Sequence, residues 1–280
     1  MNSDAGAAVA RLVEIMARLR AEGGCPWDRE QDLRSLRPYL LEEAFEVLEE
    51  MDRVVNGGPW SALCEELGDL LFQIVFHAQL ASEQGQFEMA DVARAIAEKI
   101  ERRHPHVFGE AKVGSTSEVL ANWARLKAEE KRKRTGRVGS VLDGVPAAAP
   151  ALLRAERLTE KASQVGFDWP SLAGVRAKLD EELAELDRAI ESRKRAAIEH
   201  ELGDVLFSLA NLARFLRTPG EDALREANRR FVRRFHRVEA ALRAEGISPA
   251  EASLERMERE WETAKREEAE RTSKATSVDP

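Results

Sequence analysis

Cysteine, aromatic residues and an excess of positive charge are all scarce or missing in this chain, and each absence excludes a class of protein. The only cysteines, Cys25 and Cys64, form no CxxC pair. This excludes a thiolate zinc site and a disulfide scaffold. Free cysteines are typical of a reducing compartment, so we expect a cytoplasmic protein.

The charge balance and the lack of long apolar runs exclude two kinds of partner. Lys and Arg total 43 against 51 Asp and Glu, a net charge of −8. A general nucleic-acid binder needs clustered positive charge, so no nucleic-acid partner is expected. The most apolar segment, residues 70–80, contains Gln73 and His77 and is shorter than the roughly 20 residues that span a bilayer. It predicts a buried core helix and no membrane partner, and the first residues do not resemble a signal peptide.

The residues that are abundant favour helix. Aromatic residues make up 6% of the chain, whereas hydrophobic residues make up 43% and charged residues 34%. Ala, Leu, Glu and Arg favour helix interiors over strands. Apolar residues recur at helical spacing along most of the chain, which predicts an all-α fold. The predicted helices cover about 12–20, 34–55, 60–84, 89–103, 117–134, 151–164, 172–195, 197–216, 219–245 and 248–268.

The chain length and its breaker residues predict two domains. At 280 residues the chain fits two ordinary domains. Residues 135–150 combine glycine and proline with no periodic apolar face, which is typical of a linker. We therefore expect domains at 1–134 and 151–268, and a disordered polar tail at 269–280.

An internal repeat relates the two halves. Residues 66–72 read ELGDLLF and residues 201–207 read ELGDVLF. Upstream, LEEAFE at 41–46 is echoed by DEELAE at 180–185. Downstream, Lys99, Arg102 and Arg103 match Arg230, Arg233 and Arg234, and Trp123 matches Trp261. The same order of matches in both halves predicts a duplicated helical module.

The repeated segments carry pairs of carboxylates at helical spacing. Residues three apart share a helix face, so two antiparallel helices in each half would bring four carboxylates together. The four carboxylates would repel one another unless bound cations neutralised their charge. Because all the ligand atoms would be oxygens, Mg²⁺ is the cation that fits best. The predicted metal ligands are Glu43, Glu46, Glu66 and Asp69 in the first half, and Glu182, Glu185, Glu201 and Asp204 in the second.

A Glu-rich helix face is more often solvated surface, but the flanking residues favour a site. Glu66 and Asp69 lie beside one of the most apolar stretches of the chain, and Glu201 and Asp204 have similar neighbours. Carboxylates beside a core face are rarely without partners. Gly68 would cost about 1 kcal/mol of helix stability relative to alanine, so close packing or ligand approach is the better reason for it.

These motifs together resemble the MazG family. The EExxE and ExxD motifs occur twice, with GCPWD at 24–28, RRHPHVF at 102–108 and VGFDW at 165–169. The acidic motifs alone would indicate only the wider all-α pyrophosphohydrolase superfamily, which includes dimeric dUTPases. The resemblance covers nearly the whole chain. It implies two tandem modules, each completing a four-helix-type bundle by dimerisation, in a homodimer that hydrolyses nucleoside triphosphates to monophosphate and pyrophosphate, as nucleotide-pool house-cleaning.

The same resemblance assigns roles in the second half. Glu182, Glu185, Glu201 and Asp204 would be the catalytic, Mg²⁺-holding residues. The implied nucleotide-binding residues are Lys178, Glu181, Arg230, Arg233, Arg234 and Trp261. The position that matches Lys178 in the first half is Tyr39, which lacks an ammonium group. We therefore expect the principal active site to lie in the second half.

Other interpretations remain open at this stage. The arginines can lie on a solvated face, and Trp261 can belong to the core. A di-iron carboxylate bundle needs two ExxH motifs, and only residues 101–104 supply one. A helical scaffold with merely soluble acidic faces is the non-enzymatic alternative, and a strict dUTPase is the alternative enzyme.

Overall fold

A computed structural model gives the fold of residues 2–116, 118–119, 122–123, 125–126, 129–130 and 139–276, and side chains from 4 to 270 within these ranges. These residues form helices and connecting turns, with no strand among them. The all-α prediction is confirmed. The chain divides into two compact units, residues 1–134 and 135–280.

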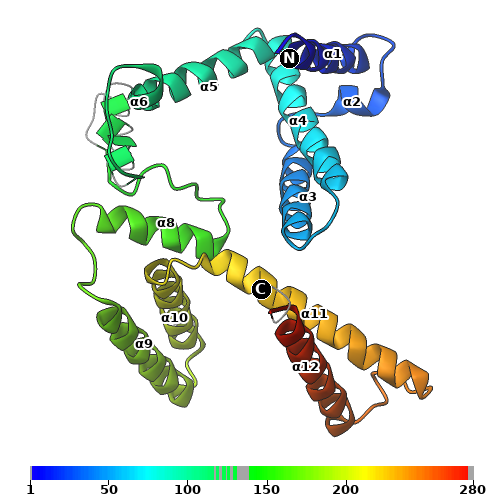
Figure 1. The fold of residues 1–280 in the computed structure, drawn as a ribbon, viewed down its shortest axis with the longest axis vertical. Helices are drawn as coiled ribbons and strands as arrows, with labels where there is room; N and C mark the ends of the chain where they lie inside the picture. Colours follow the sequence, from blue (N-terminus) through cyan, green and yellow to red (C-terminus); the bar gives the residue numbers. More distant parts are fainter. Residues whose placement is uncertain are drawn as a thin grey trace. The chain divides into compact units, whose positions relative to one another are not determined.

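The first unit is built around one helical hairpin (Figure 1). Its helices are α1 (Asn2–Arg20), α2 (Pro26–Glu30), α3 (Arg37–Val55), α4 (Trp60–Glu83), α5 (Met89–Arg103) and α6 (Pro105–Phe108). The turn from α3 to α4 contains Gly57 at φ +87°, a conformation that glycine adopts without strain. Antiparallel packing of α3 on α4 follows from this short connection.

The core of the first unit lies where α1 meets α4. Met16, Leu36, Val75, Phe76 and Leu80 form one buried cluster. The three residues from α4 belong to the segment 70–80, so its prediction as a core helix is confirmed. In the part of the chain that the structure describes, no helix is long and apolar enough to cross a membrane.

The second unit contains two hairpins (Figure 1). Its helices are α8 (Ala151–Ser163), α9 (Leu172–Ser192), α10 (Arg195–Phe215), α11 (Gly220–Ala244) and α12 (Leu254–Thr276). α9 packs against α10, and α11 packs against α12. α8 covers part of α10. Val175, Leu179, Val238 and Leu242 are among its buried residues.

The last helix differs from its prediction at both ends. It begins at Leu254 and not near 248, because the Ser253 hydroxyl accepts a hydrogen bond from the Arg256 amide at 3.2 Å and caps the helix there. It continues to Thr276, through most of the expected tail, since no glycine or proline interrupts it. Residues 277–280 and the linker residues 135–138 lie outside the described part of the chain.

Each acidic hairpin leaves large apolar side chains exposed. On α3 and α4 these include Leu41, Phe45 and Leu67. On α9 and α10 they include Leu183, Leu202, Leu206, Phe207 and Leu209, with Ile190 near the turn. A two-helix layer can cover only one face of each helix, so these side chains stay exposed among the described residues.

Candidate metal centres on two acidic hairpins

Carboxylates from both helices of the second hairpin meet in one cluster. Glu182 comes from α9, and Glu201 and Asp204 come from α10. One carboxylate oxygen of each lies within 4.8 Å of the others. The sharp turn after α9, with Arg193 in the left-handed conformation at φ 55°, allows α10 to return along α9. The predicted convergence is therefore seen for three of the four carboxylates.

Lys178 neutralises part of this cluster. Its ammonium Nζ lies 2.9 Å from Glu182 Oε1 and 3.0 Å from Glu181 Oε1. Hydrogen bonds from Lys178 to Glu182 and Glu181 raise the pKa of the lysine above its ordinary value. Glu182 is buried. The lysine thus supplies the opposite charge that a buried carboxylate requires.

Glu185 lies outside the group of three carboxylates. It is one helical turn beyond Glu182, and its Oε1 accepts a hydrogen bond from Arg188 at 3.2 Å. Asp204 has a neighbour that the sequence analysis did not single out, His200, whose Nδ1 lies 3.5 Å from Asp204 Oδ2. His200 and Asp204 are four residues apart on α10, a spacing that could have signalled this contact.

The first hairpin repeats the cluster without a lysine. Oxygens of Glu43, Glu46 and Glu66 lie within 4.8 Å of one another. Burial first, and then repulsion from Asp69, Glu46 and Glu66, raises the pKa of Glu43. The pKa of Glu66 is raised by the same two effects. Asp69 thus acts on this cluster although it lies outside the group of three.

Two further residues distinguish the first cluster. Glu50, one turn beyond Glu46, is only 6% exposed; Arg53 donates a hydrogen bond to its Oε1, and its Oε2 has no hydrogen-bond partner among the described residues. Glu50 was not among the predicted ligands, because a run of glutamates on a helix is typical of a solvated face. Tyr39, in place of a lysine, packs edge-on against Trp27 with ring centroids 5.6 Å apart.

The donor sets of both clusters fit a hard divalent cation. Every ligand atom is a carboxylate oxygen, and each cluster draws on both helices of its hairpin. Mg²⁺ prefers oxygen ligands and is commonly held by one or two carboxylates plus substrate phosphates. Burial is the largest cause of the raised pKa values of Glu43 and Glu66, and repulsion between the carboxylates is the second; a bound cation would offset both, because it stabilises the charged form.

Of the predicted nucleotide-binding residues, Lys178 and Glu181 lie on α9 beside the carboxylates, whereas the other four lie on the hairpin of α11 and α12. Arg233 lies 3.0 Å from Glu268 and 3.4 Å from Glu226, and Arg234 lies 2.6 Å from Glu268. Arg230 lies 3.7 Å from Glu226. These arginines are therefore not free on a solvated face, because they pair with carboxylates within α11 and across to α12.

Trp261 belongs to the contact between α11 and α12. Its ring centroid is 5.2 Å from that of Phe231, and the Arg234 guanidinium lies 5.8 Å from the ring centre. Among the described residues, α12 packs mainly against α11, while α9 packs mainly against α10. The three arginines and Trp261 are thus held by one hairpin of this unit, and the carboxylate cluster with Lys178 is held by the other.

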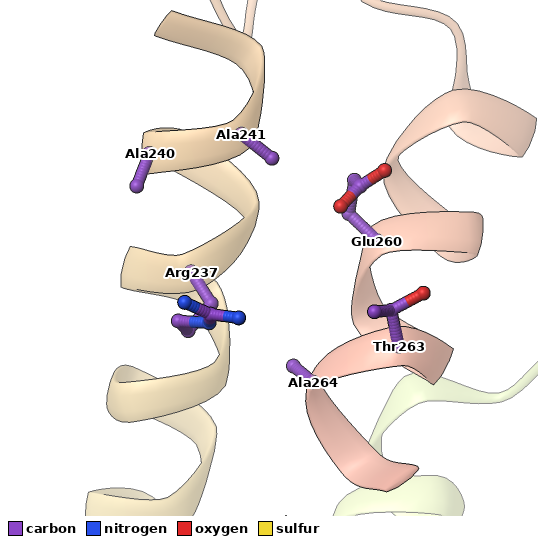
Figure 2. A pocket seen from close by; sticks show the side chains of 6 residues that line it. All are labelled: Arg237, Ala240, Ala241, Glu260, Thr263 and Ala264. Atoms are coloured by element: carbon purple, nitrogen blue, oxygen red, sulfur yellow. The ribbon is translucent and has the colours of Figure 1, made fainter. Parts of the chain in front are cut away.

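A small cavity of about 240 Å³ lies between α11 and α12 (Figure 2). Ala240, Ala241 and Ala264 form its apolar part, and Arg237, Glu260 and Thr263 complete it. None of the clustered carboxylates lines this cavity. It is a gap left by small side chains and does not extend the acidic site.

The fold and the site place this chain in the class of all-α proteins with paired acidic motifs. In two of its hairpins, both helices contribute carboxylates to one cluster. The domain described as "MazG nucleotide pyrophosphohydrolase domain" matches residues 31–108 and 171–240, which contain both hairpins. This chain belongs to the MazG family.

Relatives in several bacteria support this assignment over most of the chain. The nucleoside triphosphate pyrophosphohydrolase of Escherichia coli K12 is 44% identical over 265 residues, which is 93% of this chain and 98% of that protein. A Thermotoga maritima protein named nucleoside triphosphate pyrophosphohydrolase/pyrophosphatase MazG is 44% identical over 263 residues, 94% of this chain and 97% of that protein. The uncharacterised YabN of Bacillus subtilis is 41% identical over 255 residues, 91% of this chain and 51% of its own length.

Proposed function

We propose that this protein hydrolyses nucleoside triphosphates to nucleoside monophosphate and pyrophosphate, with Mg²⁺ bound at the acidic hairpin of the second unit. The observation that carries the proposal is the cluster of Glu182, Glu201 and Asp204, three carboxylates within 4.8 Å. An acidic protein can bind a polyanion at such a place only if cations lie between them. The names of the E. coli and T. maritima relatives support the same reaction.

The residues of the site would divide the work. Glu182, Glu201 and Asp204 would hold the cation, and Glu185, one turn further along α9, would be its fourth ligand. When bound, Mg²⁺ neutralises the triphosphate and polarises the attacked phosphorus. One of the carboxylates accepts the proton of the attacking water.

The cationic residues would complete the nucleotide site. Lys178, whose ammonium group lies beside Glu182, would contact a phosphate of the substrate. Arg230, Arg233 and Arg234 would contact phosphates, and Trp261 would contact the base by stacking. Since these residues lie on α11 and α12, the proposal requires that hairpin to face a carboxylate cluster in the assembled protein.

A homodimer would bring the arginine-bearing hairpin close to a carboxylate cluster, and it would also cover the exposed apolar faces of α9 and α10. Leu202, Leu206 and Phe207 are exposed on α10, close to the acidic positions Glu201 and Asp204. Two such hairpins packed together form a four-helix bundle that buries these side chains. Light scattering should show a dimer, and a Leu206→Glu variant should shift it toward monomer. We further propose a cytoplasmic role in cleaning the nucleotide pool.

The second unit is proposed as the principal active site. Its cluster has Lys178, whereas the first cluster has Tyr39 and uncompensated repulsion. Glu43, Glu46, Glu66 and Asp69 are then a second Mg²⁺ site. Glu185→Ala and Glu46→Ala are a matched pair of variants, because the two residues occupy equivalent positions in the repeat.

Product analysis tests the proposed function directly. Purified protein is incubated with each common NTP and dNTP, including dUTP, with Mg²⁺ or with EDTA. We expect monophosphate plus pyrophosphate only with metal, loss of activity in Glu185→Ala, and retained activity in Glu46→Ala. No turnover of any nucleotide by the folded wild-type protein would contradict the proposal and favour a scaffold role.

A further inference from the structure

One arrangement of charged residues occurs in both units and has no part in the carboxylate clusters. In the second unit, Glu268 of α12 accepts hydrogen bonds from Arg233 at 3.0 Å and from Arg234 at 2.7 Å. In the first unit, Glu130 accepts from Arg102 at 2.8 Å and from Arg103 at 3.2 Å. Each glutamate therefore links two consecutive arginines of another segment. We call this arrangement the arginine fork.

The two forks occupy equivalent positions of the repeat. Glu130 follows Trp123 by seven residues, and Glu268 follows Trp261 by seven residues. The two arginine pairs were matched in the sequence comparison, but the glutamates were not, because they stand in long runs of charge. Because the same contact is present in both copies of the repeat, a chance surface contact is a poor explanation.

Within each fork, one arginine side chain is largely buried and the other is about half exposed. The side chains of Arg103 and Arg234 are 19% and 24% exposed, whereas those of Arg102 and Arg233 are 52% and 54% exposed. In the second unit the largely buried arginine also lies over the ring of Trp261. The more exposed arginine of each fork is therefore accessible to a ligand from solvent.

The carboxylate changes what the arginine pair can do. Two adjacent guanidinium groups repel each other, and each long side chain loses considerable rotamer freedom when it binds a ligand. A carboxylate that accepts from both reduces the repulsion and fixes the geometry before the ligand arrives. Hydrogen bonds from Arg233 and Arg234 also lower the pKa of Glu268, so the carboxylate stays charged at neutral pH.

We infer that Glu268 is a positioning residue for substrate binding: it holds Arg233 and Arg234 in the geometry in which they contact the phosphates of a nucleoside triphosphate. It makes no contact with the substrate itself. This inference rests on the proposed function, since it assigns the arginines to the triphosphate. It adds a residue outside the acidic motifs, on the last helix of the unit.

The test compares Glu268→Gln with two matched variants, using ATP and Mg²⁺ in steady-state kinetics. Glu268→Gln removes the charge and leaves the shape, and we expect KM for ATP to rise about tenfold while kcat stays within about twofold. Glu268→Asp keeps the charge and should restore most of the KM. Glu267→Gln, one residue earlier, removes the partner of Arg237 and should leave both constants unchanged.

Two further measurements separate positioning from a merely structural role. Competitive inhibition by pyrophosphate should weaken in Glu268→Gln more than inhibition by AMP, because pyrophosphate has two phosphate groups for the arginines to contact and AMP has one. The Kd of α,β-methylene-ATP, measured by calorimetry, should rise in Glu268→Gln by the same factor as KM. This measurement does not depend on turnover. Wild-type protein that binds this analogue without hydrolysing ATP would contradict the proposed function alone.

Other results would overturn the inference. An unchanged or lower KM in Glu268→Gln would mean that the carboxylate only tethers α12 or competes with phosphate. Equal losses in kcat for Glu268→Gln and Glu268→Asp, with lower melting temperatures for both, would indicate a structural role. Wild-type protein that fails to bind α,β-methylene-ATP would also overturn it.

Discussion

Replacement of Lys178 by methionine should destabilise the second unit in the absence of metal. Methionine keeps the length of the side chain and removes the ammonium group, which lies 2.9 Å from Glu182 Oε1. The side chain of Glu182 is 8% exposed and that of Lys178 is 33% exposed. Loss of one partner from a fully buried pair costs about 3–5 kcal/mol. Because water reaches this lysine, we expect a loss of about 1–2 kcal/mol.

Arg176→Met is the matched control for this prediction. Arg176 pairs with Asp180 at 3.1 Å on the same helix and with the same four-residue spacing, but both side chains are exposed. Exposed pairs of this kind contribute at most about 0.5 kcal/mol. A difference between the two variants therefore measures the burial of Glu182 and not the general effect of removing a cation from α9.

The assay is urea unfolding at pH 7, first in EDTA and then with saturating Mg²⁺. In EDTA the midpoint for Lys178→Met should fall well below that for Arg176→Met. With Mg²⁺ the gap should narrow, because the metal replaces the ammonium group beside Glu182. Equal midpoints in EDTA, or a gap that Mg²⁺ leaves unchanged, would refute the reasoning.

The remaining predictions concern pH and packing. The pKa of Glu43 is raised above its ordinary value of 4.5, mainly by burial, so protonation of Glu43 stabilises the folded state. This stabilisation is present below about pH 4.5 and is lost as the pH rises through the raised pKa. In EDTA, the urea midpoint of Glu43→Gln should therefore not show this loss. Hydrogen bonds from Arg103 and Arg102 lower the pKa of Glu130 to about 2. The ionised carboxylate therefore stabilises the folded state above about pH 4.5, and this stabilisation is lost as the pH falls toward 2. Glu130→Gln should be less stable than wild type at pH 7, and the difference should shrink in acid. Phe76→Ala should cost about 3–5 kcal/mol and Leu242→Ala about 2–5 kcal/mol. Since the chain divides into two compact units, we expect them to unfold independently, so calorimetry should show each substitution lowering only the transition of its own unit; a shift of both transitions would contradict this.

Local sequence patterns determined most of the helices and the place of the acidic motifs. α5 spans Met89–Arg103 as predicted, because its apolar spacing is regular and Pro105 follows. The repeat of ELGD placed Glu66 and Glu201 on helices that return along Glu43 and Glu182. These features depend on residues close together in the chain, which helical periodicity reports directly.

Only the tertiary structure decided which charged groups meet. It brought three of the four predicted carboxylates together in each hairpin, buried Glu50 beside them, and joined Arg233 and Arg234 to Glu268. Such contacts join residues on different turns or different helices. The sequence by itself determined that this is a duplicated all-helical protein with paired acidic motifs. The partners of each charge depend on the register and rotation of packed helices, which periodicity along one helix does not contain.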